Sequence, residues 1–267
     1  MSHFTVLVIN TKGEDNVEEM LEPFYEGNDV PEYVADEVTD KDWERFRDFY
    51  IKKDKENSTM SNEKLYEKYG DDWNSNCWRK DENDVWKEYS TYNPDSKWDW
   101  WVIGGRWRGM LRLKKGKTGI VGESGVFDNP PMYEGGVDQA KFGDIDWDLM
   151  NSNPDDFEKY SRQWELIVEG DEPKNDDEKK AVDYNYYKPE YYTKKYGNKE
   201  TYIKAMMLFS TYAVLKDGKW FEPGEMGWWG VSHASKEDKL DFELNFYTKF
   251  LKDLPEDALL TVVDCHI

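Results

Sequence analysis

Two short runs far apart in the chain constrain the fold more than any other feature. Residues 2–9 (SHFTVLVI) and residues 259–267 (LLTVVDCHI) are rich in β-branched and apolar side chains and nearly free of charge. Such runs predict central strands that are buried on both faces of a sheet. An amphipathic helix is predicted at residues 236–254, directly before the second run. We therefore predict an α+β fold with a mainly antiparallel sheet and flanking helices, in which the first and last strands are neighbours.

Local patterns predict the other elements. Aromatic spacing, cap residues and glycine stops predict three further helices, over residues 40–55, 61–69 and 154–169. A ferredoxin-like core with large insertions has this kind of element order, and an antiparallel sheet of another strand order is the alternative. Two hairpins are also predicted. One has its turn at Asp217-Gly218, between residues 209–215 and 220–221, and the other has a turn or bulge at Gly104-Gly105, between residues 98–103 and 106–113.

The chain of 267 residues is long enough to bury a core without disulfide bonds. We predict a single α+β domain over residues 1–267, interrupted by two acidic stretches. Residues 11–97 are predicted as a partly helical insertion. Residues 116–205 are predicted as a Tyr-rich insertion that contains the helix at 154–169.

Charge and composition restrict the partners. The chain has 57 Asp and Glu against 36 Lys and Arg, a formal net charge of -21, which argues against direct nucleic-acid binding and against anionic membranes. No apolar run is long enough to span a membrane, and no basic region precedes an apolar stretch at the N-terminus. Cys77 and Cys265 form no disulfide framework, as expected in a reducing cytoplasm. The 16% aromatic content excludes a disordered acidic chain.

The first candidate site lies where the two predicted terminal strands meet. If these strands pair antiparallel, His3 comes close to Asp264 and His266, which share one face of their strand. Two imidazoles and a carboxylate could bind a divalent metal or act as an acid–base pair. No HExxH or similar metal motif accompanies them. The alternative is a polar strand end in which these groups only form hydrogen bonds.

The second candidate site is a basic segment. Residues 97–117 have a local excess of six positive charges, in a chain that is otherwise acidic. Guanidinium groups beside indole rings can hold a phosphate while a ring stacks on a base, so a small phosphorylated ligand is a candidate. The segment is not a P-loop, and the alternative is a hairpin whose Trp residues are core and whose cations neutralise acids. The predicted ligand-binding residues are Gly104, Gly105, Arg106, Trp107 and Arg108.

Four segments carry a resemblance. MSHFTVLVIN, NPDSKWDWWVIGGRW, YAVLKDGKWFEPGEMGWWG and LLTVVDCHI together cover about a third of the chain. This combination resembles a family of uncharacterised proteins encoded by tailed phages and prophages. The resemblance implies a genomic setting, the cytoplasm of an infected bacterial host cell, and an accessory role against host defences or host metabolism. It implies no particular reaction.

Three function hypotheses follow. The favoured one is an acidic phage accessory protein that acts by binding, and that antagonises a host protein of anti-phage defence. Catalysis is less favoured but left open. A nucleotide-signal binding or hydrolysing protein would use Arg106, Trp107 and Arg108, whereas a metal-dependent enzyme would use His3, Asp264 and His266.

Overall fold

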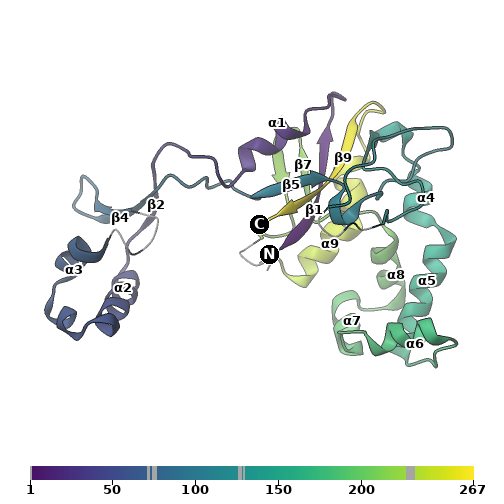
Figure 1. Ribbon diagram of the computed structural model, residues 1–267. Helices are drawn as coiled ribbons and strands as arrows, with labels where there is room; N and C mark the ends of the chain where they lie inside the picture. Colours follow the sequence, from purple (N-terminus) through teal and green to yellow (C-terminus); the bar gives the residue numbers. More distant parts are fainter. Residues whose placement is uncertain (1, 71–72, 74–76, 126–127, 129, 227–231) are drawn as a thin grey trace. The chain divides into compact units, whose positions relative to one another are not determined.

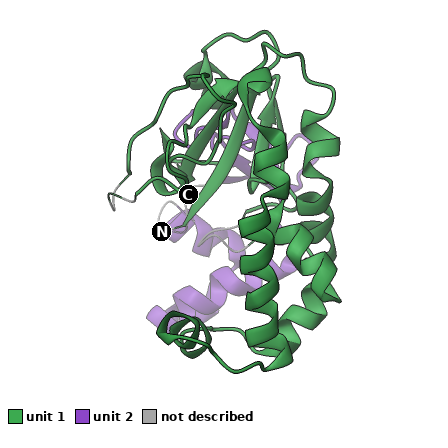
Figure 2. Ribbon diagram, turned by 90° about the vertical axis from the view of Figure 1, so that its right-hand side faces the viewer, with its two compact units in different colours: residues 1–23, 97–267 green, residues 24–96 purple. Residues whose placement is uncertain are grey.

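The computed structural model describes residues 2–70, 73, 77–125, 128, 130–226 and 232–267 (Figure 1). The chain divides into two compact units (Figure 2). The first unit contains residues 1–23 and 97–267, and the second contains residues 24–96. The sequence predicted one domain with an insertion at 11–97, and the second unit lies inside that stretch.

The first unit is built on a mixed six-stranded sheet. Five strands follow the order β5-β9-β1-β7-β8, and β6 also pairs with β9. All pairs are antiparallel except β1 with β7. The strands are β1 (His3–Asn10), β5 (Trp100–Ile103), β6 (Gln139–Lys141), β7 (Ala213–Lys216), β8 (Lys219–Phe221) and β9 (Leu259–His266).

The pairing of β1 with β9 confirms the central fold prediction. The two strands run antiparallel with His3 opposite His266, and both chain ends are seen side by side in Figure 1. The fold is α+β, as predicted. The strand order differs from a ferredoxin-like core, because β7 lies directly beside β1 and parallel to it. In the ferredoxin-like arrangement another strand separates the two parallel ones.

One predicted hairpin is confirmed and the other is wrong. The turn between β7 and β8 has Asp217 at φ 48° and Gly218 at φ 77°, as a primed turn requires. After β5, however, the chain forms a 3₁₀ turn at Gly105–Trp107 rather than a returning strand. The predicted second strand makes only isolated bridges, from Leu111 to Val137 and from Leu113 to Ile145. The segment predicted as an insertion at 116–205 also contributes β6 to the sheet.

Helices surround this sheet. The predicted helix at 154–169 begins at Pro154 with Asn153 as its cap, and it ends in a π-helical turn before Gly170. The predicted helix at 236–254 begins after the Ser235 cap and continues as a π-helical turn to Leu251. The helices of this unit are α1 (Val17–Leu21), α4 (Trp147–Ser152), α5 (Pro154–Trp164), α6 (Asp176–Asp183), α7 (Pro189–Tyr196), α8 (Lys199–Met207) and α9 (Lys236–Phe246). The unit also has a 3₁₀ turn at Phe142–Asp144 and π-helical turns at Glu165–Glu169 and Tyr247–Leu251, and a 3₁₀ turn at Glu22–Phe24 spans the boundary to the second unit.

The second unit has its own small sheet and aromatic core. The strands β2 (Tyr33–Glu37), β4 (Trp86–Ser90) and β3 (Cys77–Lys80) are antiparallel in this order. The helices α2 (Asp40–Lys53) and α3 (Asn62–Tyr69), joined by a 3₁₀ turn at Lys55–Thr59, confirm the predictions at 40–55 and 61–69. Thr39, not Asp40, caps α2, because it forms a capping box with Asp42. The core consists of Trp43, Phe46, Tyr50, Leu65 and Trp78.

No helix within the described ranges is both long enough and apolar enough to cross a membrane.

Candidate functional site

One face of the β1–β9 pair changes from apolar to polar along its length. Leu7 and Ile9 of β1 lie opposite Val262 and Leu260 of β9, and all four are buried in the core beneath α9. Toward the chain ends the same face carries Thr5 opposite Asp264, and then His3 opposite His266. Because side chains alternate along a strand, this register places both imidazoles and one carboxylate on a single face. The structure therefore brings together the three residues predicted from the sequence.

His3 and Asp264 form the inner half of the site. The Nδ1 atom of His3 lies 2.8 Å from Oδ1 of Asp264. The Asp264 side chain is only 1% exposed, and its Oδ2 atom accepts the backbone N–H of Arg106 at 2.9 Å. Since both carboxylate oxygens have partners, Asp264 is fixed in place. It in turn fixes the orientation of the His3 ring.

His266 forms the outer half with a carboxylate that the sequence analysis did not include. Its Nδ1 atom lies 2.5 Å from Oδ1 of Asp99, and the Asp99 backbone N–H donates to the His266 carbonyl oxygen. The ring centroids of His3 and His266 are 5.0 Å apart, with the rings inclined at 68°. The Nε2 atom of His266 is buried, and no described residue bonds to it. The edge of the Trp100 ring lies beside His3, at a centroid distance of 5.9 Å.

The Gly104-Gly105 loop lies against buried carboxylates rather than around an open pocket. Both glycines have positive φ, at 82° and 57°. A Cβ atom on Gly105 would overlap the Asp264 side chain, and one on Gly104 would lie 2.7 Å from Oδ2 of Asp138. The absence of side chains at these two positions thus permits close approach of backbone to carboxylate. The sequence predicted such an approach, but toward a bound ligand.

Asp138 organises the rest of this loop. It is fully buried, its Oδ1 accepts the N–H of Gly109 at 2.6 Å, and its Oδ2 accepts the N–H of Gly122 at 2.8 Å. Burial raises the pKa of the Asp138 carboxyl, although the backbone donors and the nearby Arg108 act in the opposite direction. Trp107 packs against the main core. The predicted ligand-binding residues 104–108 are thus attached to the fold through Asp138, Asp264 and the core.

The other basic residues of 97–117 do not converge on residues 104–108. Lys97 pairs with Glu222 at 3.0 Å, and Lys117 pairs with Asp144 at 2.7 Å. Arg112 lies over the Tyr133 ring, 4.6 Å from its centroid. These contacts match the alternative in which cations of the segment neutralise neighbouring acids.

Among the residues that the structure describes, the site offers groups for proton transfer rather than a side-chain nucleophile. Cys265 lies between Asp264 and His266 in sequence, yet it points to the opposite face and is fully buried. Burial raises the pKa of its thiol well above the ordinary value, so it stays a thiol. Searched over the described residues, His, Cys, Asp and Glu side chains form no group of three or more that could hold a metal ion. The Nδ1 atoms of both histidines face carboxylates, and these contacts fix the orientation of both rings.

No protein-family model, curated protein or solved structure matches this chain.

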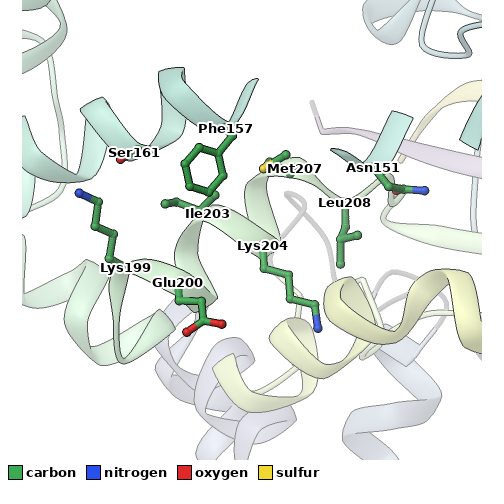
Figure 3. A pocket seen from close by; sticks show the side chains of 9 residues that line it. All are labelled: Asn151, Phe157, Ser161, Lys199, Glu200, Ile203, Lys204, Met207 and Leu208. Atoms are coloured by element: carbon green, nitrogen blue, oxygen red, sulfur yellow. The ribbon is translucent and has the colours of Figure 1, made fainter. Parts of the chain in front are cut away.

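Among the depressions elsewhere on the first unit, two hold about 570 and 510 Å³. One, of about 570 Å³, lies between α5 and α8. In Figure 3 the ring of Phe157 from α5 stands over Ile203 of α8, with Met207 and Leu208 continuing the apolar lining. Lys199, Glu200 and Lys204 stand around them. The second depression, of about 510 Å³, is lined by the basic segment 112–117.

Asp99 and Asp138 are the two site residues that sequence reasoning missed. Asp99 adjoins β5, so its role depends on the pairing of β5 with β9, which places Trp100 opposite His266. Asp138 adjoins β6, which pairs with the other end of β9. The only signal in the sequence is that each is an acid beside a short apolar or aromatic stretch, and this pattern is common in an acidic chain.

Proposed function

We propose that the protein is a metal-independent phosphodiesterase that uses His3 and His266 as a general acid–base pair. The observation that supports this is the presence of two adjacent imidazoles, each with Nδ1 held by its own carboxylate. Such a carboxylate fixes the ring and its tautomer. Two rings held in this way on one sheet face leave both Nε2 atoms outside the carboxylate contacts, and the buried Nε2 of His266 has no hydrogen-bond partner among the described residues.

The proposed reaction needs one histidine neutral and the other protonated. The neutral imidazole takes a proton through Nε2 from the attacking group, which is water or a neighbouring hydroxyl of the substrate. The attacking oxygen forms a bond to phosphorus, and the bond from phosphorus to the leaving oxygen breaks. The imidazolium donates its proton to that leaving oxygen, so charge and atoms balance. Asp264 and Asp99 orient the rings through their contacts with the Nδ1 atoms.

Two features support a phosphodiester, and in particular a nucleotide, as the substrate class. Phosphodiester cleavage uses an acid and a base in the same step and needs no nucleophile from the protein. Trp100 lies beside His3 and is 39% exposed, so its indole ring can stack on a base. The proposal thus keeps the nucleotide-hydrolysing hypothesis but moves its chemistry from Arg106–Arg108 to the histidine pair.

Substitution of either histidine should remove the activity. His3→Asn and His266→Asn each keep a side-chain N–H that can donate to the carboxylate, but neither provides an Nε2 atom. We expect each to lower kcat/KM by about 100-fold, the ordinary contribution of one acid or base. The measurement is hydrolysis of bis(p-nitrophenyl) phosphate and of a 2′,3′-cyclic nucleotide in EDTA. The wild-type pH profile of kcat/KM should be bell-shaped.

His233 provides the matched control because it is the remaining histidine of the chain and is exposed. His233→Asn should retain full activity, and thermal melting should show that all three variants are folded. Activity that is lost in EDTA and restored by a divalent ion would instead favour the metal-dependent hypothesis. Wild-type protein that cleaves neither substrate, at any pH from 5 to 9, would contradict acid–base catalysis on phosphodiesters.

A second candidate function is the antagonism of a host protein by a phage accessory protein. The phage setting rests on the resemblance in four sequence segments, and the groove in Figure 3 supports a binding role. Phe157 is 52% exposed at this groove, and isolated aromatic anchors of this kind are frequent interface hot spots.

Removal of the Phe157 ring tests the binding function. Phe157→Ser should weaken the complex with a host protein by about 30-fold, as expected for the loss of an aromatic hot spot. The partner is first identified by cross-linking in infected cells, and its affinity is then measured by titration calorimetry with the purified pair. Phe49→Ser is the control, since Phe49 is 49% exposed on α2 of the second unit. Equal affinities for the wild type and Phe157→Ser would refute a role of this groove in binding.

A further inference from the structure

The basic segment between β5 and β6 forms a pocket of its own, separate from the histidine pair. The pocket holds about 510 Å³ and is lined by Arg112, Lys114, Lys115 and Lys117, with Glu134 as its one acidic lining residue. The first three residues of β9 pair with β6, whereas His266 is at the other end of β9. Five residues of strand, or about 16 Å, separate Thr261 from His266. The pocket is therefore a distinct feature.

The local fold directs the cations to one place. Leu113 packs on the core and bridges to Ile145, so the residues on either side of it face away from that contact. The chain then turns, with the N–H of Lys117 donating to the carbonyl oxygen of Lys114. Gly116 occupies the turn with φ at 81°, a conformation that favours glycine. Four of the six residues from Arg112 to Lys117 are thus basic and line one depression.

Three of these cations are held by partners, and the fourth is not. Lys114 Nζ donates to the Gly143 carbonyl oxygen at 2.7 Å, and Lys117 pairs with Asp144 at 2.7 Å. Arg112 lies over the Tyr133 ring, and the Asp156 carboxylate is 3.9 Å away. No hydrogen bond or ion pair reaches the Lys115 ammonium from any residue that the structure describes. The lining itself contains four basic side chains and one acidic one.

We infer that this pocket binds a polyphosphate group, as in inorganic pyrophosphate or a nucleoside triphosphate. A pocket lining with four cations and one acid stands out in a chain with a charge of -21, and a ligand with several negative charges complements it. The volume lies in the ordinary range for small-molecule sites. Lys114 and Lys117 are preorganised by their partners, and Lys115 is available to close on the ligand.

Titration calorimetry with inorganic pyrophosphate tests this site in the full-length protein. At 50 mM NaCl we expect a dissociation constant below about 100 μM, and weaker binding at 200 mM NaCl. Lys114→Gln and Lys115→Gln should each weaken binding by about 10-fold, because each removes one charge-assisted hydrogen bond. Lys219→Gln, an exposed lysine of β8, should change the affinity by less than about twofold.

A second titration with ATP distinguishes the two sources of the ligand. Binding of ATP at least about 10-fold tighter than that of pyrophosphate assigns the pocket to a nucleotide, and equal affinity assigns it to the inorganic ion. The absence of binding at 1 mM pyrophosphate would overturn the inference. So would equal weakening by Lys219→Gln and Lys115→Gln, or displacement of pyrophosphate by a lower concentration of duplex DNA. His3→Asn should leave this binding unchanged, so the result is independent of the proposed phosphodiesterase.

Discussion

Asp138→Ala should lower the free energy of unfolding by about 4 kcal/mol, because it leaves several buried donors unsatisfied. The Asp138 carboxylate accepts N–H groups from two loop glycines, Gly109 and Gly122, and is itself fully buried. Without the carboxylate, these two N–H groups lose the acceptor that they have in the folded protein. Urea unfolding followed by tryptophan fluorescence measures the effect.

The same carboxyl gives the prediction a pH dependence. Because burial raises the pKa of Asp138, the folded state binds its proton more tightly than the unfolded state does. The stability that this proton contributes is fully present below the unfolded pKa, near 3.9, and is lost as the pH rises through the folded value. The difference in unfolding free energy between the wild type and Asp138→Ala should therefore narrow as the pH is raised above about 4.

Two further variants make this result specific. The side chain in Asp138→Asn keeps one carbonyl oxygen, which can accept one of the two N–H groups. This variant should therefore lower the free energy of unfolding by only about 2 kcal/mol. Asp177→Ala removes a carboxylate that is 95% exposed, and its unfolding free energy should stay within about 0.5 kcal/mol of the wild type. A loss below about 1 kcal/mol for Asp138→Ala would mean that the loop finds other acceptors.

The elements that sequence reasoning predicted well are those that depend on nearby residues. The β1 run is apolar on both faces, Asp217-Gly218 favours positive φ, and Asn153-Pro154 both caps and starts a helix. Each of these signals acts over a few residues. The convergence of His3 with Asp264 and His266 was also predictable, because it requires only that two long strands pair antiparallel and side chains alternate.

The loop after β5 was mispredicted because its conformation is set by residues far away in sequence. Gly104-Gly105 resembles a hairpin turn locally, but the backbone instead follows two buried carboxylates, Asp138 and Asp264. A shift of one residue in the pairing of β5 with β9 would also separate Asp99 from His266. Short strands such as β5 and β6 contain too few residues to define such a register from their pattern alone.

Gly105→Ala should disrupt both stability and the histidine site, since the added methyl group overlaps the Asp264 side chain. The positive φ of 57° disfavours alanine by about 1–2 kcal/mol, and the overlap adds about 1–3 kcal/mol. We expect a total loss of about 3 kcal/mol, measured by urea unfolding, together with loss of phosphodiesterase activity.

Gly116→Ala has the backbone effect without the steric overlap, so it separates the two contributions. Gly116 has φ at 81°, and no atom lies within 4 Å of the position that its Cβ would occupy. Gly116→Ala should therefore lower the free energy of unfolding only by the backbone contribution, about 1–2 kcal/mol. It should keep the full activity of the histidine pair. The difference between the two variants measures how tightly the loop is held against Asp264. Equal losses of stability in both variants would mean that the loop moves away from Asp264 at little cost. In that case the Arg106 N–H would contribute little to the orientation of Asp264, and so of His3.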